Sequence, residues 1–85
     1  MSLVWTDKFK RNYQKLPTKI RKKFAKQLNF LVTNFRHPSL RVKKMKGREN
    51  VWEARVDRSY RFTFHKENSD IILRTVGPHD EALGN

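Results

Sequence analysis

The feature that most constrains the fold is a change in hydrophobic spacing about halfway along the chain. In the first part, apolar side chains recur three or four residues apart, which is helical spacing; from Leu40 onward the period shortens to two, which is β spacing. A chain of 85 residues has room for one hydrophobic core. The sequence therefore predicts a single α+β domain spanning residues 1–85, with helices first and a sheet second.

The first part of the chain predicts a helical hairpin. Thr6 or Asp7 can cap a short helix, and Pro17 ends it and suits the start of a second helix. The second helix is expected to stop at residues 37–38, His-Pro. The apolar face of the first helix holds Phe9, Tyr13 and Leu16, and that of the second holds Ile20, Phe24, Leu28, Leu31 and Phe35.

The second part predicts three or four antiparallel strands in a meander. Leu40, Val42 and Met45 give a weak strand signal, whereas two later segments alternate cleanly and are followed by an apolar strand at residues 71–76. The inward positions of the two alternating segments are Trp52, Ala54 and Val56, then Tyr60, Phe62 and Phe64. We expect the N-terminal helical hairpin to pack on one face of this sheet, the aromatic face.

The positive charge is concentrated in the first half of the chain. The whole sequence has a formal net charge of +12, but residues 1–48 hold 15 basic side chains and one acid, for a net of +14, and residues 49–85 have a net of −2. This asymmetry favours a polyanionic partner, and RNA above other polyanions. The alternatives are a merely solvated basic surface and an anionic membrane, and the membrane is disfavoured because the core needs the available Trp, Phe and Leu residues.

Composition also bears on location and cofactors. The sequence contains no Cys, so the fold rests on apolar packing in a reducing compartment, and we expect a cytoplasmic protein. The first residues contain no long apolar run, which argues against a signal peptide or a membrane span. The three His lack the close spacing of metal ligands, so no metal is expected. The sequence also has no Gly-rich phosphate loop or nucleotide fingerprint, so no small-molecule cofactor is expected.

The polar face of the sheet carries the candidate chemistry. A three-residue turn at residues 57–59 would set Arg55 directly opposite Arg61. Two like charges side by side are destabilising, and an anion bound between them would explain the arrangement. The last strand is expected to bring Arg74 to the same cluster and to end with His79 close to the two arginines.

These residue types can cleave RNA without a metal. Arginine forks bind phosphate at two points, and a neighbouring imidazole can transfer a proton. A 2′-hydroxyl would attack the adjacent phosphorus while fixed positive charge stabilises the transition state. Lys43, Lys44 and Lys46 precede the meander and could line the same groove, whereas His37 and His65 are interpreted as structural.

The order of these parts resembles the RelE/ParE superfamily of type II toxin–antitoxin toxins over essentially the whole chain. The resemblance runs from the basic helical hairpin and a Lys-rich segment ending at residues 45–47, through residues 51–56 and 59–64, to the ending at residues 76–80, Val-Gly-Pro-His-Asp. The most specific pieces are Tyr60-Arg61 at the start of a strand and the Gly-x-His-Asp ending.

The resemblance implies a ribosome-dependent mRNA endoribonuclease that inhibits translation and is held inactive by a cognate antitoxin, with rRNA contacts through the basic helices. By position, Arg61 matches an arginine that stabilises the transition state in RelE-like members, and His79 matches an acid/base histidine of YafQ-like members. Arg55 falls where some relatives carry a basic active-site residue, and Lys44 and Lys46 would contact RNA.

Two departures from the family pattern leave alternatives open. Glu53 stands where RelE itself has a lysine, and it could act as a base, pair with Arg55 or mark a weakened site; the tail at residues 83–85 lacks the aromatic residue of many relatives. Besides the endoribonuclease, the alternatives are a ParE-type module that inhibits DNA gyrase and a non-catalytic RNA-binding or antitoxin-sequestered domain. The predicted catalytic set is His79, Arg61, Arg55 and Glu53, and the predicted RNA-binding set is Lys43, Lys44, Lys46 and Arg74.

Overall fold

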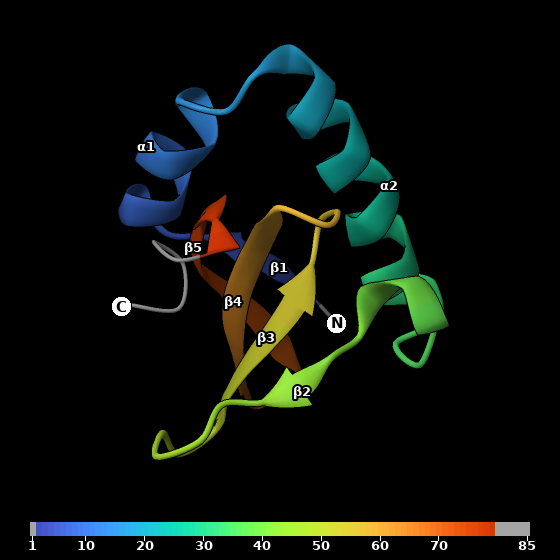
Figure 1. Cartoon of the computed structure of the whole chain (residues 1–85). Coiled ribbons are helices and arrows are strands. Elements are labelled where there is room, and N and C mark those ends of the chain that lie inside the picture. Colours follow the sequence, from blue (N-terminus) through green and yellow to red (C-terminus); the bar gives the residue numbers. More distant parts are fainter. Residues whose placement is uncertain (1, 80–85) are drawn as a thin grey trace.

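Helices occupy the first half of the chain and most strands the second (Figure 1). The structure is a computed structural model that describes residues 2–79; Asp80 of the predicted ending and the tail at residues 83–85 lie outside the described residues. The elements are β1 (Leu3–Trp5), α1 (Asp7–Gln14), α2 (Thr18–Thr33), the 3-10 helix η1 (Pro38–Leu40), β2 (Lys43–Lys44), β3 (Val51–Arg55), β4 (Tyr60–Glu67) and β5 (Asp70–Pro78).

The sheet has five strands in the order β1-β5-β4-β3-β2. β2, β3, β4 and β5 form the predicted antiparallel meander, and the α+β class with a helical hairpin on the sheet is confirmed. The expected strand count was too low, because β1 adds a fifth strand that runs parallel to β5, with Leu3 opposite Ile71. A three-residue strand is too short to show a period of two, and its partner lies at the other end of the chain.

The ends of the two helices follow from local hydrogen bonds. The Thr6 hydroxyl caps α1 by accepting from the Phe9 backbone N–H at 3.2 Å, and it also donates to the Leu73 carbonyl at 2.7 Å. The residue before α2 is Pro17, as expected. However, α2 ends at Thr33 rather than at residues 37–38, because Asn34 leaves the helical conformation and Pro38 begins η1.

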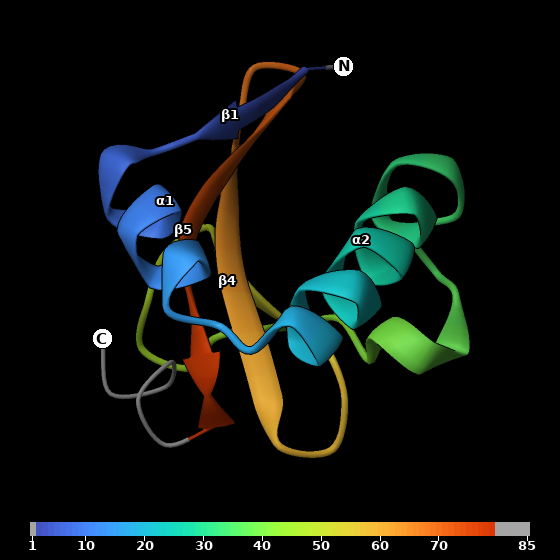
Figure 2. The ribbon, with the colours of Figure 1, turned by 90° about the horizontal axis from the view of Figure 1, so that it is seen from above.

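A chain of aromatic rings joins the helices to the sheet. Phe24 of α2 packs against Phe9 of α1 at 5.5 Å between ring centroids and against Phe62 of β4 at 5.2 Å. Trp5 of β1 contacts both helices through edge-on ring contacts. Figure 2 shows the connection between α1 and α2 passing over β4, so the helices cover one face of the sheet and leave the opposite face for other uses. Neither described helix is long and apolar enough to cross a membrane.

Candidate functional site

The turn between β3 and β4 is held by the side chain of Asp57. Its carboxylate accepts from the backbone N–H groups of Ser59 and Tyr60 at 2.8 and 2.9 Å and pairs with Lys23 of α2 at 3.2 Å. This turn fixes the register, and the predicted Arg55–Arg61 pair is confirmed. Both arginines lie on the face of the sheet turned away from the helices, because Ala54 and Phe62, one position along each strand, belong to the core.

The same contacts determine the charge state of the turn. Burial alone would raise the pKa of Asp57, but the Ser59 N–H, the Lys23 ammonium and the Tyr60 N–H outweigh it and hold the pKa below its ordinary value. The carboxylate is therefore ionised down to lower pH than in an exposed aspartate. The turn that positions the two arginines is thus stabilised by a partly buried negative charge.

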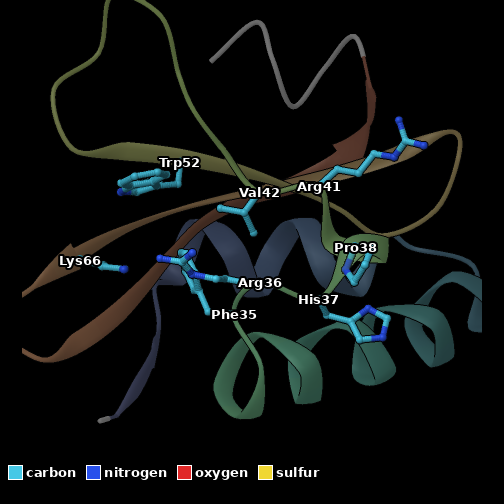
Figure 3. Close-up of a pocket in the computed structure, with 8 residues that line it drawn as sticks. All are labelled: Phe35, Arg36, His37, Pro38, Arg41, Val42, Trp52 and Lys66. Atoms are coloured by element: carbon cyan, nitrogen blue, oxygen red, sulfur yellow. The ribbon is translucent and has the colours of Figure 1, made fainter.

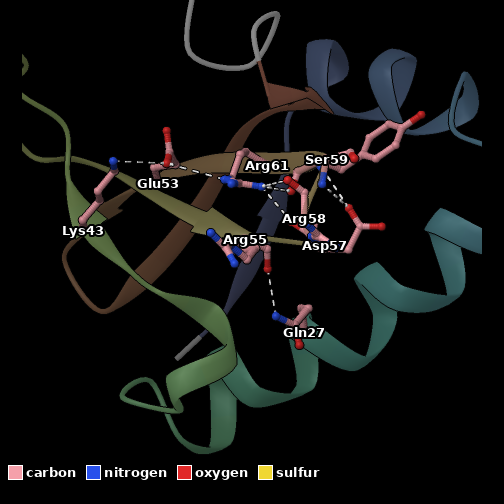
Figure 4. A network of polar contacts seen from close by, with 9 residues as sticks. Gln27, Lys43, Glu53, Arg55, Asp57, Arg58, Ser59 and Arg61 are labelled. Carbon is pink, nitrogen blue, oxygen red and sulfur yellow. Dashed lines mark hydrogen bonds and ion pairs between the residues drawn. The ribbon is translucent and has the colours of Figure 1, made fainter.

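Arg61 is a structural as well as a chemical residue. Its side chain lies almost fully buried, and its Nη1 donates to the backbone carbonyls of Asp57 at 2.7 Å, Arg58 at 3.2 Å and Tyr60 at 3.1 Å. Its Nε lies 3.9 Å from Oε1 of Glu53 (Figure 4). Two of the three guanidinium nitrogens are therefore held, Nη1 by the turn and Nε by Glu53, so the group is oriented before any ligand arrives.

Gln27 supports Arg55 from the helical side and was missed by the sequence analysis. Its amide nitrogen donates to the carbonyls of Arg55 at 2.8 Å and Ser39 at 3.1 Å, which ties α2 to the end of β3 (Figure 4). Gln27 is only 5% exposed. The available signal was a polar residue inside the apolar stripe, between Phe24 and Leu31.

The site residues converge on a small cavity of about 220 Å³. Its lining contains five of the eight residues predicted for the site, plus Arg41: the full set is Arg41, Lys43, Glu53, Arg55, Arg61 and His79. His79 is held there because its backbone N–H donates to the Ser59 carbonyl at 2.8 Å, at the same turn that orients Arg61. The predicted meeting of Arg55, Arg61 and His79 at one place on the sheet is therefore confirmed as geometry.

Positive charge dominates the cavity. Four of its lining residues are cationic. Among residues 2–79 the only carboxylate in the lining is that of Glu53, which is 3% exposed and lies 3.8 Å from the Lys43 ammonium. Burial and then the guanidinium groups of Arg41, Arg61 and Arg58 lower the pKa of Arg55, although an arginine remains charged at any physiological pH. Of the alternatives for Glu53, the structure pairs it with Lys43 and Arg61 rather than with Arg55.

Several polar atoms in this cavity have no partner within the described part of the chain. Oε2 of Glu53, Nε of Arg55 and Nδ1 of His79 are buried without a hydrogen bond to any residue in 2–79. Buried polar atoms are normally hydrogen-bonded, and each exception calls for an explanation. Three such atoms in one basic cavity fit an anionic ligand that accepts a hydrogen bond from Arg55 and donates one to Glu53.

The structure does not bring the remaining predicted residues into the cavity. Lys44 pairs with Trp52 and so faces the opposite side of the sheet from Lys43, and Lys46 follows β2 in an exposed loop. The expectation that Arg74 joins the Arg55–Arg61 cluster is wrong. Gly77 is the residue of β5 that lies opposite Arg61, so Arg74 lies three positions away along the strand, where its side chain contacts His65 at 3.1 Å. Contact of Lys44, Lys46 and Arg74 with RNA stays a prediction.

Arg41 is the lining residue that the sequence analysis did not single out. It follows η1 in the left-handed conformation, with φ at 45°, and this turn directs the chain into β2. A non-glycine residue in this conformation is uncommon. No periodic pattern marks the position, so only its place among basic residues pointed to it.

Comparison with solved structures defines the class of fold. The chain is similar to the Methanococcus jannaschii RelB–RelE antitoxin–toxin complex, at 22% identity over 92% of each chain with a TM-score of 0.76. It is also similar to the YoeB/ParE toxin from Agrobacterium tumefaciens, at 19% identity over 93% of this chain and 99% of that one with a TM-score of 0.78. The Escherichia coli DinJ–YafQ toxin–antitoxin complex matches at 9% identity over 94% and 93%, with a TM-score of 0.79. The fold is therefore that of the RelE-like toxins.

A family model gives the membership. The model of the ParE toxin of the type II toxin–antitoxin system parDE matches residues 3–83, nearly the whole chain. The chain belongs to this family and to the RelE/ParE superfamily of toxins that the sequence resembled. A search of curated protein sequences found no match.

Proposed function

We propose that this toxin cuts mRNA in the decoding site of the ribosome and so inhibits translation. The observation that carries the proposal is the convergence of Arg55, Arg61, Glu53 and His79 on one small basic cavity, with unpartnered polar atoms on three of them. Arginine pairs suit a phosphodiester, and a carboxylate and an imidazole supply a base and an acid.

The reaction is an internal transfer at phosphorus. The Glu53 carboxylate accepts the proton of the 2′-hydroxyl, whose oxygen attacks the adjacent phosphorus, and the bond from phosphorus to the 5′-oxygen breaks. A protonated His79 gives its proton to that leaving oxygen. The products are a 2′,3′-cyclic phosphate and a 5′-hydroxyl. Each proton-transfer residue is expected to contribute about 10²–10⁴-fold to the rate.

The arginines stabilise the charge that develops on the phosphoryl oxygens. Arg61 is already fixed by three carbonyl oxygens through Nη1, and its Nη2 forms no hydrogen bond to the described residues. Arg55 sits opposite it in the register, with its Nε unpartnered in residues 2–79. Donors that are fixed before the reaction need no reorganisation during it, which is the usual source of electrostatic catalysis.

We also propose that a cognate antitoxin protein binds the chain and blocks the cavity. Two of the three solved structures named above are toxin–antitoxin complexes, from Methanococcus jannaschii and Escherichia coli. A short acidic partner would complement the net charge of +14 on residues 1–48. A neighbouring open reading frame that encodes such a protein would support this proposal.

The function is tested by inducing the protein in bacterial cells and mapping mRNA ends by primer extension. Wild-type protein should arrest growth and produce cuts within translated codons, and Arg55→Gln should abolish both. Arg58→Gln is the matched control, because Arg58 is exposed on the same turn and lies outside the cavity. Equal cutting by wild type and Arg55→Gln would contradict the proposal.

A second candidate is inhibition of DNA gyrase, which the match to the ParE family model favours. Such a toxin binds its target and cleaves nothing, so a proton-transfer pair would have no role in it. A supercoiling assay with purified gyrase separates the two activities. Inhibition of supercoiling that survives the Arg55→Gln change, with no mRNA cleavage, would favour this candidate.

A further inference from the structure

A second and larger cavity lies on the helical side of the sheet. It has a volume of about 580 Å³ and lies between the segment after α2, the start of β3 and the end of β4 (Figure 3). Its apolar lining includes Phe35, Val42 and Trp52, and its basic lining includes Arg36, Arg41 and Lys66. We call it the aromatic cleft. Within the part of the chain that the structure describes, no acidic residue belongs to this lining.

The side chains of the aromatic cleft can bind a flat ring that carries polar atoms. Phe35 and Trp52 meet edge-on at 6.3 Å, and the ammonium group of Lys66 lies 4.1 Å from the Phe35 ring centre and 5.6 Å from that of Trp52. Lys66 is exposed, so its side chain can move aside for a ligand. Nε1 of Trp52 is buried with no hydrogen-bond partner in residues 2–79, which leaves a donor free for an acceptor on the ligand.

The two cavities differ in size in a way that suits two parts of one ligand. The Arg55–Arg61 cavity, about 220 Å³, is below the roughly 300–1,000 Å³ range of pockets that hold a whole small molecule, and it fits a phosphate group. The aromatic cleft, about 580 Å³, lies within that range. Arg41 lines both cavities, so its guanidinium marks a basic route around the β2 edge from one to the other.

We propose that the aromatic cleft binds one nucleobase of a single-stranded RNA whose scissile phosphate occupies the Arg55–Arg61 cavity. This inference rests on the proposed function. Single-strand binding sites combine a basic path for the backbone with aromatic side chains on which bases stack, and both are present here. The Trp52 N–H would donate to a ring nitrogen or carbonyl of the base, while Arg36 and Arg41 contact the flanking phosphates.

The test measures binding of uncleavable 2′-O-methyl RNA trinucleotides, intact or with one base removed at each position in turn. For the wild type, loss of the base at one position should weaken binding about five- to 100-fold. Trp52→Leu should bind the intact trinucleotide more weakly than the wild type by the same factor. Removing that base should weaken binding to Trp52→Leu no further. Arg55→Gln should weaken binding of all of the trinucleotides by the same factor.

A second variant guards against misfolding. Lys66→Gln changes an exposed side chain. It should weaken binding of the intact trinucleotide about two- to fivefold, and it should leave binding of the trinucleotide that lacks that base unchanged. Thermal unfolding of each variant establishes that it is folded. If Lys66→Gln and Trp52→Leu bind every trinucleotide as the wild type does, the inference is overturned.

The remaining outcomes separate the inference from the function on which it rests. Binding that depends on Arg55 but on no base overturns the aromatic cleft as a base site and leaves the proposed function standing. Absence of any Arg55-dependent binding overturns both. Trp52→Leu could instead bind RNA as the wild type does and lose affinity only for a co-expressed antitoxin. That result would make the aromatic cleft a protein-docking site and would overturn the inference.

Discussion

A single guanidinium can hold the fold and act on a ligand because its donors are spread along two edges. In Arg61, Nη1 and Nε are directed to the turn carbonyls and to Glu53, and the rest of the group faces the cavity. Replacing Arg61 would therefore disturb the turn as well as any chemistry. Arg55 has no side-chain hydrogen bond within the described chain, so it is the better residue for separating function from stability.

Asp57 gives a prediction about stability and pH. Its pKa is lowered in the folded protein, so its contribution to stability is present above the unfolded pKa of about 4 and is lost as the pH falls through the lower folded value. Asp57→Asn keeps an acceptor for the Ser59 N–H but loses the charge opposite Lys23. We expect a loss of about 1 kcal/mol in the free energy of unfolding at pH 7.

Urea unfolding at several pH values checks this prediction. The difference between wild type and Asp57→Asn should shrink as the pH falls below about 4, because the wild-type carboxylate is then progressively protonated. A difference that stays constant down to pH 2, or that grows, would mean that the charge of Asp57 does not stabilise the turn.

Among the elements, those set by local rules could be predicted and those set by distant pairing could not. The turn length alone gave the pairing of Arg55 with Arg61. Arg74 was misplaced because the alternation of β5 indicates the face of a side chain but not its position along the strand, and Gly77 is the residue that pairs with Arg61. β1 was missed because only its pairing with β5 makes three residues a strand.

Thr6 joins two elements, and a substitution there measures this connection. Its hydroxyl caps α1 through the Phe9 N–H and donates to the Leu73 carbonyl of β5. Thr6→Ala should lower the free energy of unfolding by about 1–2 kcal/mol, since both bonds are lost. Thr6→Ser keeps the hydroxyl and is the matched control. Equal losses in Ala and Ser variants, measured by chemical unfolding, would show that the methyl group rather than the hydroxyl matters.

In the whole molecule, the two halves of the chain meet at the cavity. Arg41 and Lys43 come from the strongly basic half, and Glu53, Arg55, Arg61 and His79 come from the half with a net charge of −2. In the proposed function, the first half supplies attraction for a polyanion, and the second supplies the acid, the base and the fixed arginines. Composition predicted the charge of the first half, and the strand register brings the side chains of the second half together.

This division predicts how salt affects RNA binding. The logarithm of the association constant for single-stranded RNA should fall linearly with the logarithm of salt concentration, by about 0.7 for each phosphate contact. Arg55→Gln should reduce that slope by about 0.7, because one phosphate contact is removed. Titrations at several salt concentrations check it, with Arg58→Gln as the control. An unchanged slope in Arg55→Gln would place the phosphate elsewhere.

The most direct test of the central claim is the single-turnover rate of mRNA cleavage on purified, programmed ribosomes, compared between wild type and His79→Gln. The account predicts a rate about 10²–10⁴-fold lower for His79→Gln, because the leaving oxygen loses its acid, and little change for His65→Gln, whose ring lies outside the cavity. A His79→Gln rate equal to that of the wild type would contradict the claim that this cavity cleaves RNA.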